Sequence, residues 1–275
     1  PQMAVRAEGK RGQAAVTTRP VKLAGFSPSP LWGEGRGEGL AHPRQSKSNS
    51  RPALVWKAQA ALLLVACGLI AGCESGPKVP DWSINAVGHA ERFTEAYFSG
   101  NTRIEAREFA LARAEVARTG RADLVARIEL TRCAARVASL EFGPCEGFEP
   151  LRGDASDAER AYAHYLAGQV SAQDAALLPP QHRAIAAGGA SVAGIEDPAA
   201  RLVAAGVLLR QSRATPDTAA QAVETASHQG WRRPLLAWLG VQARLADERG
   251  DAAEAARIRR RMDVVQPAVH IKPRP

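Results

Sequence analysis

Cysteine and histidine are the side chains in this 275-residue chain that offer the most recognisable chemistry. A thiol can take a lipid, close a disulfide or bind a metal, and an imidazole can bind a metal or carry a proton. The cysteines are Cys67, Cys73, Cys133 and Cys145, and the histidines after residue 73 are His89, His164, His182, His228 and His270. No histidine lies within five residues of another and no Cys/His metal spacing occurs, so we predict no metal site and histidines at surfaces or interfaces.

Cys73 follows a segment with the layout of a bacterial signal peptide. The basic residues Arg51 and Lys57 come first, and an uninterrupted apolar run covers residues 60–71. A membrane-spanning helix needs about 20 apolar residues, whereas signal peptides carry about 7 to 15 behind a basic region. The small side chains of Ala71 and Gly72 suit an extended backbone in a peptidase cleft. We therefore predict a cleaved signal peptide over residues 55–72.

The sequence Leu69-Ile70-Ala71-Gly72-Cys73 resembles the lipobox of bacterial lipoproteins. The resemblance implies a diacylglycerol on the thiol of Cys73 and an acyl chain such as palmitate on its freed amine. Two or three chains make a stable anchor. Glu74 is not the Asp that retains enteric lipoproteins at the inner membrane, so the resemblance implies the periplasmic leaflet of the outer membrane. The alternative is a short buried helix that ends at a chance cysteine.

The positive charge of the chain is concentrated before Cys73. The formal net charge is +8, yet residues 73–275 hold 26 basic and 25 acidic side chains, so we predict no nucleic-acid partner. Residues 1–54 are rich in Gly, Pro and Ser and are predicted to be disordered. Residues 27–39 resemble conceptual translations of bacterial intergenic repeats, and we expect translation to begin near Val55. The alternative is a real basic tail.

Two cysteines remain once the lipoprotein reading removes Cys67 and assigns lipid to Cys73. Because that reading places the chain in an oxidising compartment, Cys133 and Cys145 are predicted to form a disulfide. The two cysteines lie twelve residues apart, with Gly143-Pro144 between them. A disulfide between them would therefore link a loop to a helix. Two buried free thiols are the alternative.

The mature chain is predicted to be all-α. Alanine supplies 43 of its 203 residues, and β-branched and aromatic residues are few. We expect a tether over 73–82, a helical domain over 83–265 and a disordered tail over 266–275. Helix starts are predicted at Ser83, at a Thr102–Glu105 capping box, at Ser156, Ser171, Asp197-Pro198 and Thr215-Pro216, at Pro234, and after Gly250-Asp251.

The helical segments suggest antiparallel hairpins stacked as a repeat-like, α-solenoid body. Gly240, Ala252 and Ala256 fall at the spacing of the tetratricopeptide repeat, although Ala256 is small for its position and Arg259 stands where a small residue is usual. A looser echo runs from Ala96 to Ala112, and the 34-residue period fails between the two regions. The resemblance to tetratricopeptide-type lipoproteins is therefore partial.

The segment 230–238 is the most distinctive part of the body. Its Trp231, Arg232, Arg233 and Trp238 form a candidate partner-binding patch, since Trp and Arg dominate interface energetics. The competing interpretation makes Trp238 a core residue and the arginines a solvated helix start. The basic run 257–261 is interpreted as a solvated helix face with nearby acidic partners. Glu95, a lone carboxylate on a helix, is a weak candidate acid for sugar cleavage.

These observations predict a non-enzymatic, lipid-anchored envelope lipoprotein that contacts an envelope protein through its helices. The alternative is an envelope enzyme that acts on peptidoglycan or a small substrate. A pocket lined by two carboxylates or a His pair would favour the enzyme, whereas a groove with aromatic and Arg anchors and no perturbed acid would favour the adaptor. A third possibility is bulk support of the envelope without a specific partner.

Overall fold

The computed structural model describes residues 79–169 and 171–266 and confirms that this part of the chain is all-α, without a strand. The predicted signal peptide 55–72, the lipobox, Cys73 and residues 267–275 of the predicted tail lie outside the described residues. Within the described part, no helix is both long and apolar enough to cross a bilayer.

The helices are α2 Asp81–Ser99, α3 Thr102–Ala117, α4 Ala122–Ala138, the short 3-10 helix η1 Glu149–Leu151, α5 Asp157–Leu166, α6 Ala172–Leu177, α7 Pro180–Ala186, α8 Pro198–Arg210, α9 Pro216–Gln229, α10 Arg232–Glu248 and α11 Ala252–Val265.

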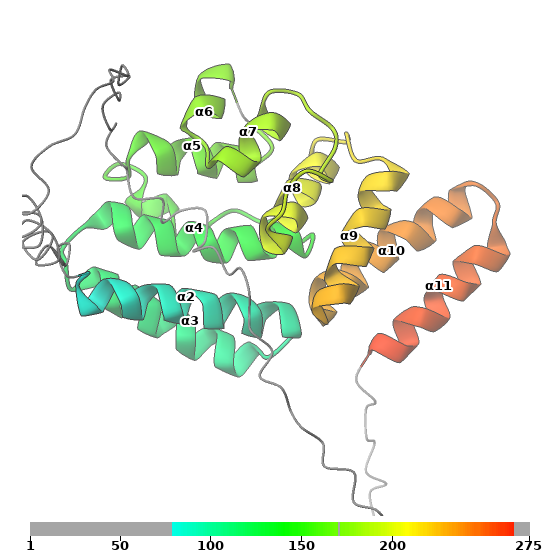
Figure 1. Cartoon of the computed structure of the whole chain (residues 1–275), viewed down its shortest axis with the longest axis horizontal. Helices are drawn as coiled ribbons and strands as arrows, with labels where there is room; N and C mark the ends of the chain where they lie inside the picture. Colours follow the sequence, from blue (N-terminus) through cyan, green and yellow to red (C-terminus); the bar gives the residue numbers. More distant parts are fainter. Residues whose placement is uncertain (1–78, 170, 267–275) are drawn as a thin grey trace, which may run out of the picture.

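Neighbouring helices in the chain pack against each other along the molecule (Figure 1). Helices α2 and α3 form a close pair at one end, and α4 lies against both. Helix α8 packs on α4 near the middle, with α5 to α7 beside it. Helices α9, α10 and α11 complete the other end, where α10 contacts both of its neighbours and also reaches back to α2.

Several helix ends follow the sequence signals. Ser156 and Ser171 form capping boxes with Glu159 and Asp174, and Asp197 and Thr215 cap helices that carry Pro in the first turn. The predicted stop at Gly230 is also confirmed, with φ of 71° in the left-handed region that glycine adopts without a Cβ penalty. Local side-chain chemistry therefore sets most boundaries of the C-terminal half.

Three predicted starts are wrong by one or two residues. Helix α2 begins at Asp81 rather than at Ser83, and a carboxylate in the first turn favours that start because it faces the positive end of the helix dipole. Asn101, not Thr102, caps α3, and its side chain accepts a hydrogen bond from the amide of Ile104. Helix α10 begins at Arg232, two residues before Pro234, so that proline still occupies the first turn where its missing N–H is tolerated.

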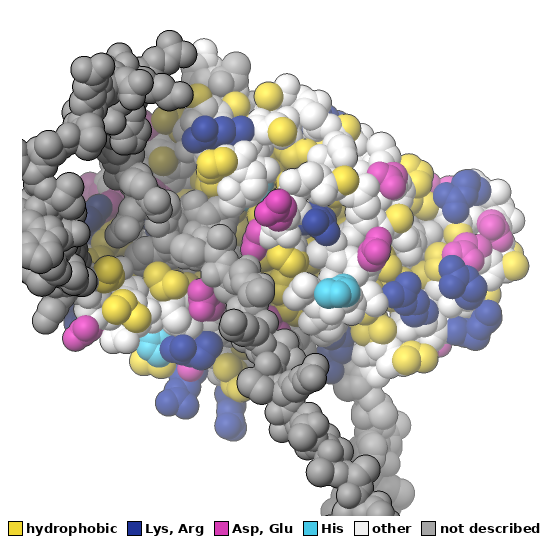
Figure 2. Space-filling view, in the orientation of Figure 1, with side chains coloured by type: hydrophobic (Ala, Val, Ile, Leu, Met, Phe, Trp, Pro, Cys, Tyr) yellow, Lys and Arg dark blue, Asp and Glu magenta, His cyan; other side chains and the backbone are white. Residues whose placement is uncertain are grey.

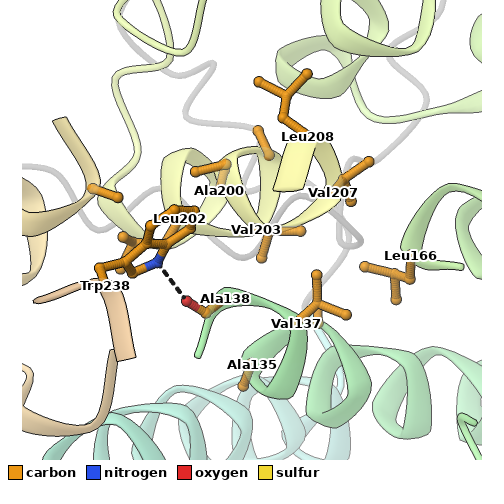
Figure 3. Packing of buried hydrophobic residues seen from close by; sticks show 14 of the residues in the cluster. Ala135, Val137, Ala138, Leu166, Ala200, Leu202, Val203, Val207, Leu208 and Trp238 are labelled. Carbon is orange, nitrogen blue, oxygen red and sulfur yellow. Dashed lines mark hydrogen bonds between the residues drawn. The ribbon is translucent and has the colours of Figure 1, made fainter. Parts of the chain in front are cut away.

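The centre of the core is the crossing of α4 and α8 (Figure 3). Val137 on α4 faces Val203 and Val207 on α8, and all three are buried. Gly206 permits the close approach, because a Cβ at this position would lie 2.3 Å from the carbonyl oxygen of Val137. The crossing therefore depends on the absence of a side chain on α8.

We predict that Gly206→Ala lowers the free energy of unfolding by about 1–3 kcal/mol, the usual cost of overpacking a core. Gly240→Ala is the matched control, because Gly240 also lies within a helix and a Cβ there meets nothing within 4 Å. That change should raise stability by about 0.5–1 kcal/mol through helix propensity. Urea denaturation followed by circular dichroism measures both, and equal effects at the two glycines would contradict the close-packing explanation.

Candidate functional site

The predicted tryptophan–arginine patch is an internal junction between α10 and α2. Trp231 is 3% exposed, its indole Nε1 donates a 2.7 Å hydrogen bond to Glu95, and its ring centroid lies 4.5 Å from that of Phe98. Arg232 donates to the carbonyl of Ser99 at the C-terminal end of α2. A cation at that end also meets the negative pole of the helix dipole.

The two remaining members of the predicted patch are also engaged inside the fold. The Arg233 guanidinium lies 4.1 Å from the ring centroid of Tyr97 and 3.7 Å from the carboxylate of Glu141. Trp238 is fully buried, and its Nε1 donates to the carbonyl oxygen of Ala138 at the end of α4 (Figure 3). The partner-binding interpretation of Trp231, Arg232, Arg233 and Trp238 is therefore corrected, because the two indoles are packed against helices more than 90 residues earlier in the chain.

Cys133 and Cys145 form a disulfide in the structure, with their Cα atoms 5.5 Å apart. Cys133 lies on α4, and Cys145 belongs to the loop that leads to Phe148, which is completely buried. The bond ties this loop to the helix that carries the core crossing.

A buried aromatic cluster holds the most strongly perturbed titratable groups. His182 on α7 is 0% exposed, contrary to the prediction of a surface or interface histidine, and its Nδ1 lies 3.1 Å from the hydroxyl of Tyr165 on α5. Burial lowers the pKa of His182 to about 3 and raises the pKa of both Tyr162 and Tyr165. The Nε2 atom of His182 is buried without a partner among the described residues. Close ring packing of the three side chains leaves this cluster part of the core.

Two glutamates are buried in the part of the chain that the structure describes, and both link helices. Glu105 of α3 accepts from Arg132 of α4 at 2.7 Å, and Glu159 of α5 accepts from Arg127 of α4 at 2.8 Å. Glu95, the candidate acid for sugar cleavage, is exposed and accepts the indole hydrogen bond of Trp231. Glu105 and Glu159 are enclosed but each is paired with an arginine, and Glu95 lacks the enclosed setting of a glycosidase acid. Within the described ranges, no three His, Cys, Asp or Glu side chains are grouped as metal ligands.

A groove of about 560 Å³ lies between α9 and α11 and is also lined by residues of α10. Its apolar floor includes Val223 of α9, Leu245 of α10 and Ile258 of α11, and Val223 and Ile258 are each 4% exposed. The polar residues that line it are Glu224, Ser227, His228, Gln242, Arg249, Glu254, Arg257 and Arg261. An apolar floor with charged walls suits binding of an extended segment better than enclosure of a small molecule.

Two of the groove arginines make contacts within the chain. Arg257 donates two hydrogen bonds of 2.7 and 2.6 Å to the carboxylate of Glu254, and this contact lowers the pKa of Glu254. Arg261 reaches from α11 across the groove and donates to the hydroxyl of Ser227 on α9, 3.1 Å away. Glu254 therefore neutralises Arg257, whereas Arg261 has only a neutral partner and Arg249 forms no ion pair with the described residues.

The basic run 257–261 is the sequence feature that could have indicated this groove, because two of its arginines line it. The prediction of acidic partners is confirmed for Arg257 with Glu254, and Arg259 pairs with Asp247 of α10. The sequence did not reveal that Arg257 and Arg261, four residues apart on one helix face, would be opposite Glu224 and His228 of α9. That juxtaposition depends on how α9 and α11 flank α10.

No protein-family model, curated protein or solved structure matches this chain.

We predict that His182 makes folding sensitive to acid. Its pKa of about 3 in the folded chain lies below the value of about 6.5 in an unfolded chain, so the unfolded state binds more protons between these values. Its contribution to stability is complete above about pH 6.5 and is lost as the pH falls toward 3, by up to about 1.4 kcal/mol per pH unit.

The measurement compares the free energy of unfolding of the native chain and His182→Gln from about pH 7 to about pH 4.5. The native chain should be the more stable at neutral pH, and its advantage should shrink as the pH falls. An advantage that stays constant over this range would show that His182 does not need to charge on unfolding.

Proposed function

We propose that this chain is a lipid-anchored envelope lipoprotein whose helical body binds an acidic segment of another envelope protein. The observation that carries the proposal is the groove between α9 and α11, with its apolar floor and its arginines. Such a site has the shape for an extended or helical segment of a partner protein. The body then acts as an adaptor at the periplasmic face of the outer membrane.

The charges of the groove favour an acidic partner. Three arginines and two glutamates line it, and Glu254, which pairs with Arg257, also interacts with Arg249, so the lining keeps one positive charge in excess. A carboxylate of the partner would replace the hydroxyl of Ser227 as the acceptor for Arg261. A charge-assisted hydrogen bond is about twice as strong as a neutral one, so the exchange favours binding.

The tetratricopeptide-like features are consistent with this role. Gly240 lies on α10 and Ala252 and Ala256 lie on α11, and these two helices pack as consecutive neighbours. Proteins built from stacked helical hairpins use their concave surfaces to bind extended partners. We propose a repeat-like relationship for this pair of helices and no regular repeat for the whole body.

The anchor rests on the residues that precede the helical body. Leu69-Ile70-Ala71-Gly72-Cys73 provides the lipobox, and the eight residues 73–80 separate the proposed lipid from α2. Such a stretch spans at most about 28 Å. Lipid on Cys73 would therefore keep α2 close to the membrane, and Glu74 supports the outer membrane as the destination.

The alternative of an envelope enzyme is favoured by one observation, since Glu224 and Glu254 both line the groove. A general acid needs a raised pKa, whereas the contact with Arg257 lowers the pKa of Glu254. Among the described residues that line the groove, His228 is the one histidine. These features support the adaptor over the enzyme, and loss of a hydrolytic activity in Glu224→Gln would reverse that order.

The anchor predicts the mass of the native chain after extraction from membranes. The mature protein should begin at Cys73 and carry a diacylglycerol and an acyl chain, because the lipobox resemblance implies both modifications. Cys73→Ser removes the thiol and should abolish lipidation. Intact-mass spectrometry measures both forms, and an unmodified Cys73 or a chain that runs through residue 72 would contradict the anchor.

The groove predicts where a partner contacts the body in cells. A photo-cross-linking residue at Ala220, an exposed lining position on α9, should join one dominant protein through an Asp- or Glu-rich peptide. The double change Arg249→Glu and Arg261→Glu should reduce the yield at least about tenfold, since two favourable charge contacts become repulsive.

The matched control is Arg244→Glu with Arg260→Glu, which changes the charge equally on α10 and α11 at exposed positions outside the groove. This control should keep the native cross-link. Equal yields from the groove variant and the native chain, or a diffuse set of adducts, would count against the proposed binding site.

A further inference from the structure

The outer face of α3 carries arginine and apolar side chains without a carboxylate. Residues 103, 107, 111, 114 and 118 are spaced by three or four and therefore share one face of the helix. Arg103, Arg107 and Arg118 alternate there with Leu111 and alanine, and Ile104 borders the same face. Two acidic residues of α3 point elsewhere, since Glu105 is buried against Arg132 and Glu108 accepts from His89 and Arg92 of α2, while Glu115 lies at the edge of the face.

This face is exposed and its charge is largely uncompensated. Ile104 is 45% exposed and Leu111 is 37% exposed, which places two large apolar side chains in solvent on a single helix. Arg103 and Arg107 form no ion pair within residues 79–169 and 171–266, and Arg118 pairs with Glu115 at the edge of the face. Figure 2 shows Lys and Arg side chains projecting from the lower edge of the molecule, where Figure 1 places α3.

The same end of the molecule leads back to the proposed lipid. Asp81 and Trp82 in the first turn of α2 share a surface recess with Arg118 and Thr119, which follow α3. Val79 and Ile84, on either side of the start of α2, are 53% and 59% exposed. The last turn of α3 is therefore beside the residues that connect to Cys73.

From this placement we propose that the outer face of α3 lies on an anionic phospholipid surface. The inference rests on the anchor in the proposed function, which brings α2 and α3 within reach of the bilayer. Basic residues near an anionic membrane are attracted to it, and apolar side chains on the same helix face enter the headgroup boundary. Long arginine side chains reach the phosphates while their aliphatic stems cover apolar surface.

The contact would orient the body on the membrane. Figure 1 shows α3 at one end of the molecule and α9 and α11, whose residues line the groove, toward the other end. With α3 against lipid, the groove would remain accessible to a partner in the periplasm. The lipid would thus attach the body to the membrane, and the α3 face would set the orientation of the body on it.

The test places an environment-sensitive thiol dye at Leu111→Cys in the full chain extracted from membranes. The chain is reconstituted in vesicles of phosphatidylcholine alone or of two parts phosphatidylcholine to one part phosphatidylglycerol. In the anionic vesicles we expect a blue shift of the dye and loss of quenching by aqueous iodide. Arg103→Glu with Arg107→Glu should abolish both effects, whereas Arg244→Glu with Arg260→Glu should retain them.

A dye that stays accessible to iodide in anionic vesicles would overturn the inference. Protection in native membranes but not in these vesicles would also overturn it, because a protein would then cover the face. Intact mass reports separately on lipid at Cys73. A chain found without lipid is measured in a Cys67→Ser, Cys73→Ser background, where the dye still reports on α3, so failure of the anchor and failure of the contact are distinguishable.

Discussion

The packing of α10 against α2 and α4 is the constraint that holds the two ends of the molecule in place relative to each other. Trp231 donates a hydrogen bond to Glu95 of α2 and packs against the ring of Phe98 near the end of that helix. Trp238 donates a hydrogen bond to the carbonyl of Ala138 at the end of α4. Each indole buries a large apolar surface and still satisfies its N–H. Because α10 also packs on α9 and α11, the same helix that joins the ends also lines the groove.

Most of the side chains with potential chemistry are used to hold helices together. Arg132 and Arg127 pair with the buried Glu105 and Glu159, and removal of one partner would leave an uncompensated buried charge. The disulfide ties the loop after α4 to that helix, and His182 packs with tyrosines in the core. Charges without strong partners among the described residues lie instead on the surface of the body.

Two such surfaces stand out among the described residues, and they differ in shape. The groove between α9 and α11 is concave, with arginines on its walls, whereas α3 presents a convex helix face of arginine and apolar residues. A concave site suits a segment of protein and a convex basic face suits a broad anionic surface. Their separation along the molecule is compatible with simultaneous membrane contact and partner binding.

The sequence by itself determined the helical class, most of the helix boundaries and the proposed lipobox. Alanine content, capping residues such as Ser156 and Asp197, and Gly230 act through neighbours a few residues away, so their effects are visible in a linear pattern. Trp231, Arg232 and Arg233 looked like an exposed patch because nothing nearby in the sequence shows that the end of α2 covers them. Likewise, only the tertiary structure decided that His182 is buried and that Arg261 and Ser227 face each other across a groove. These outcomes depend on contacts between segments that are distant in the sequence. Such contacts are set by burial and by the close crossing of helices, and the local propensities of the residues do not encode them.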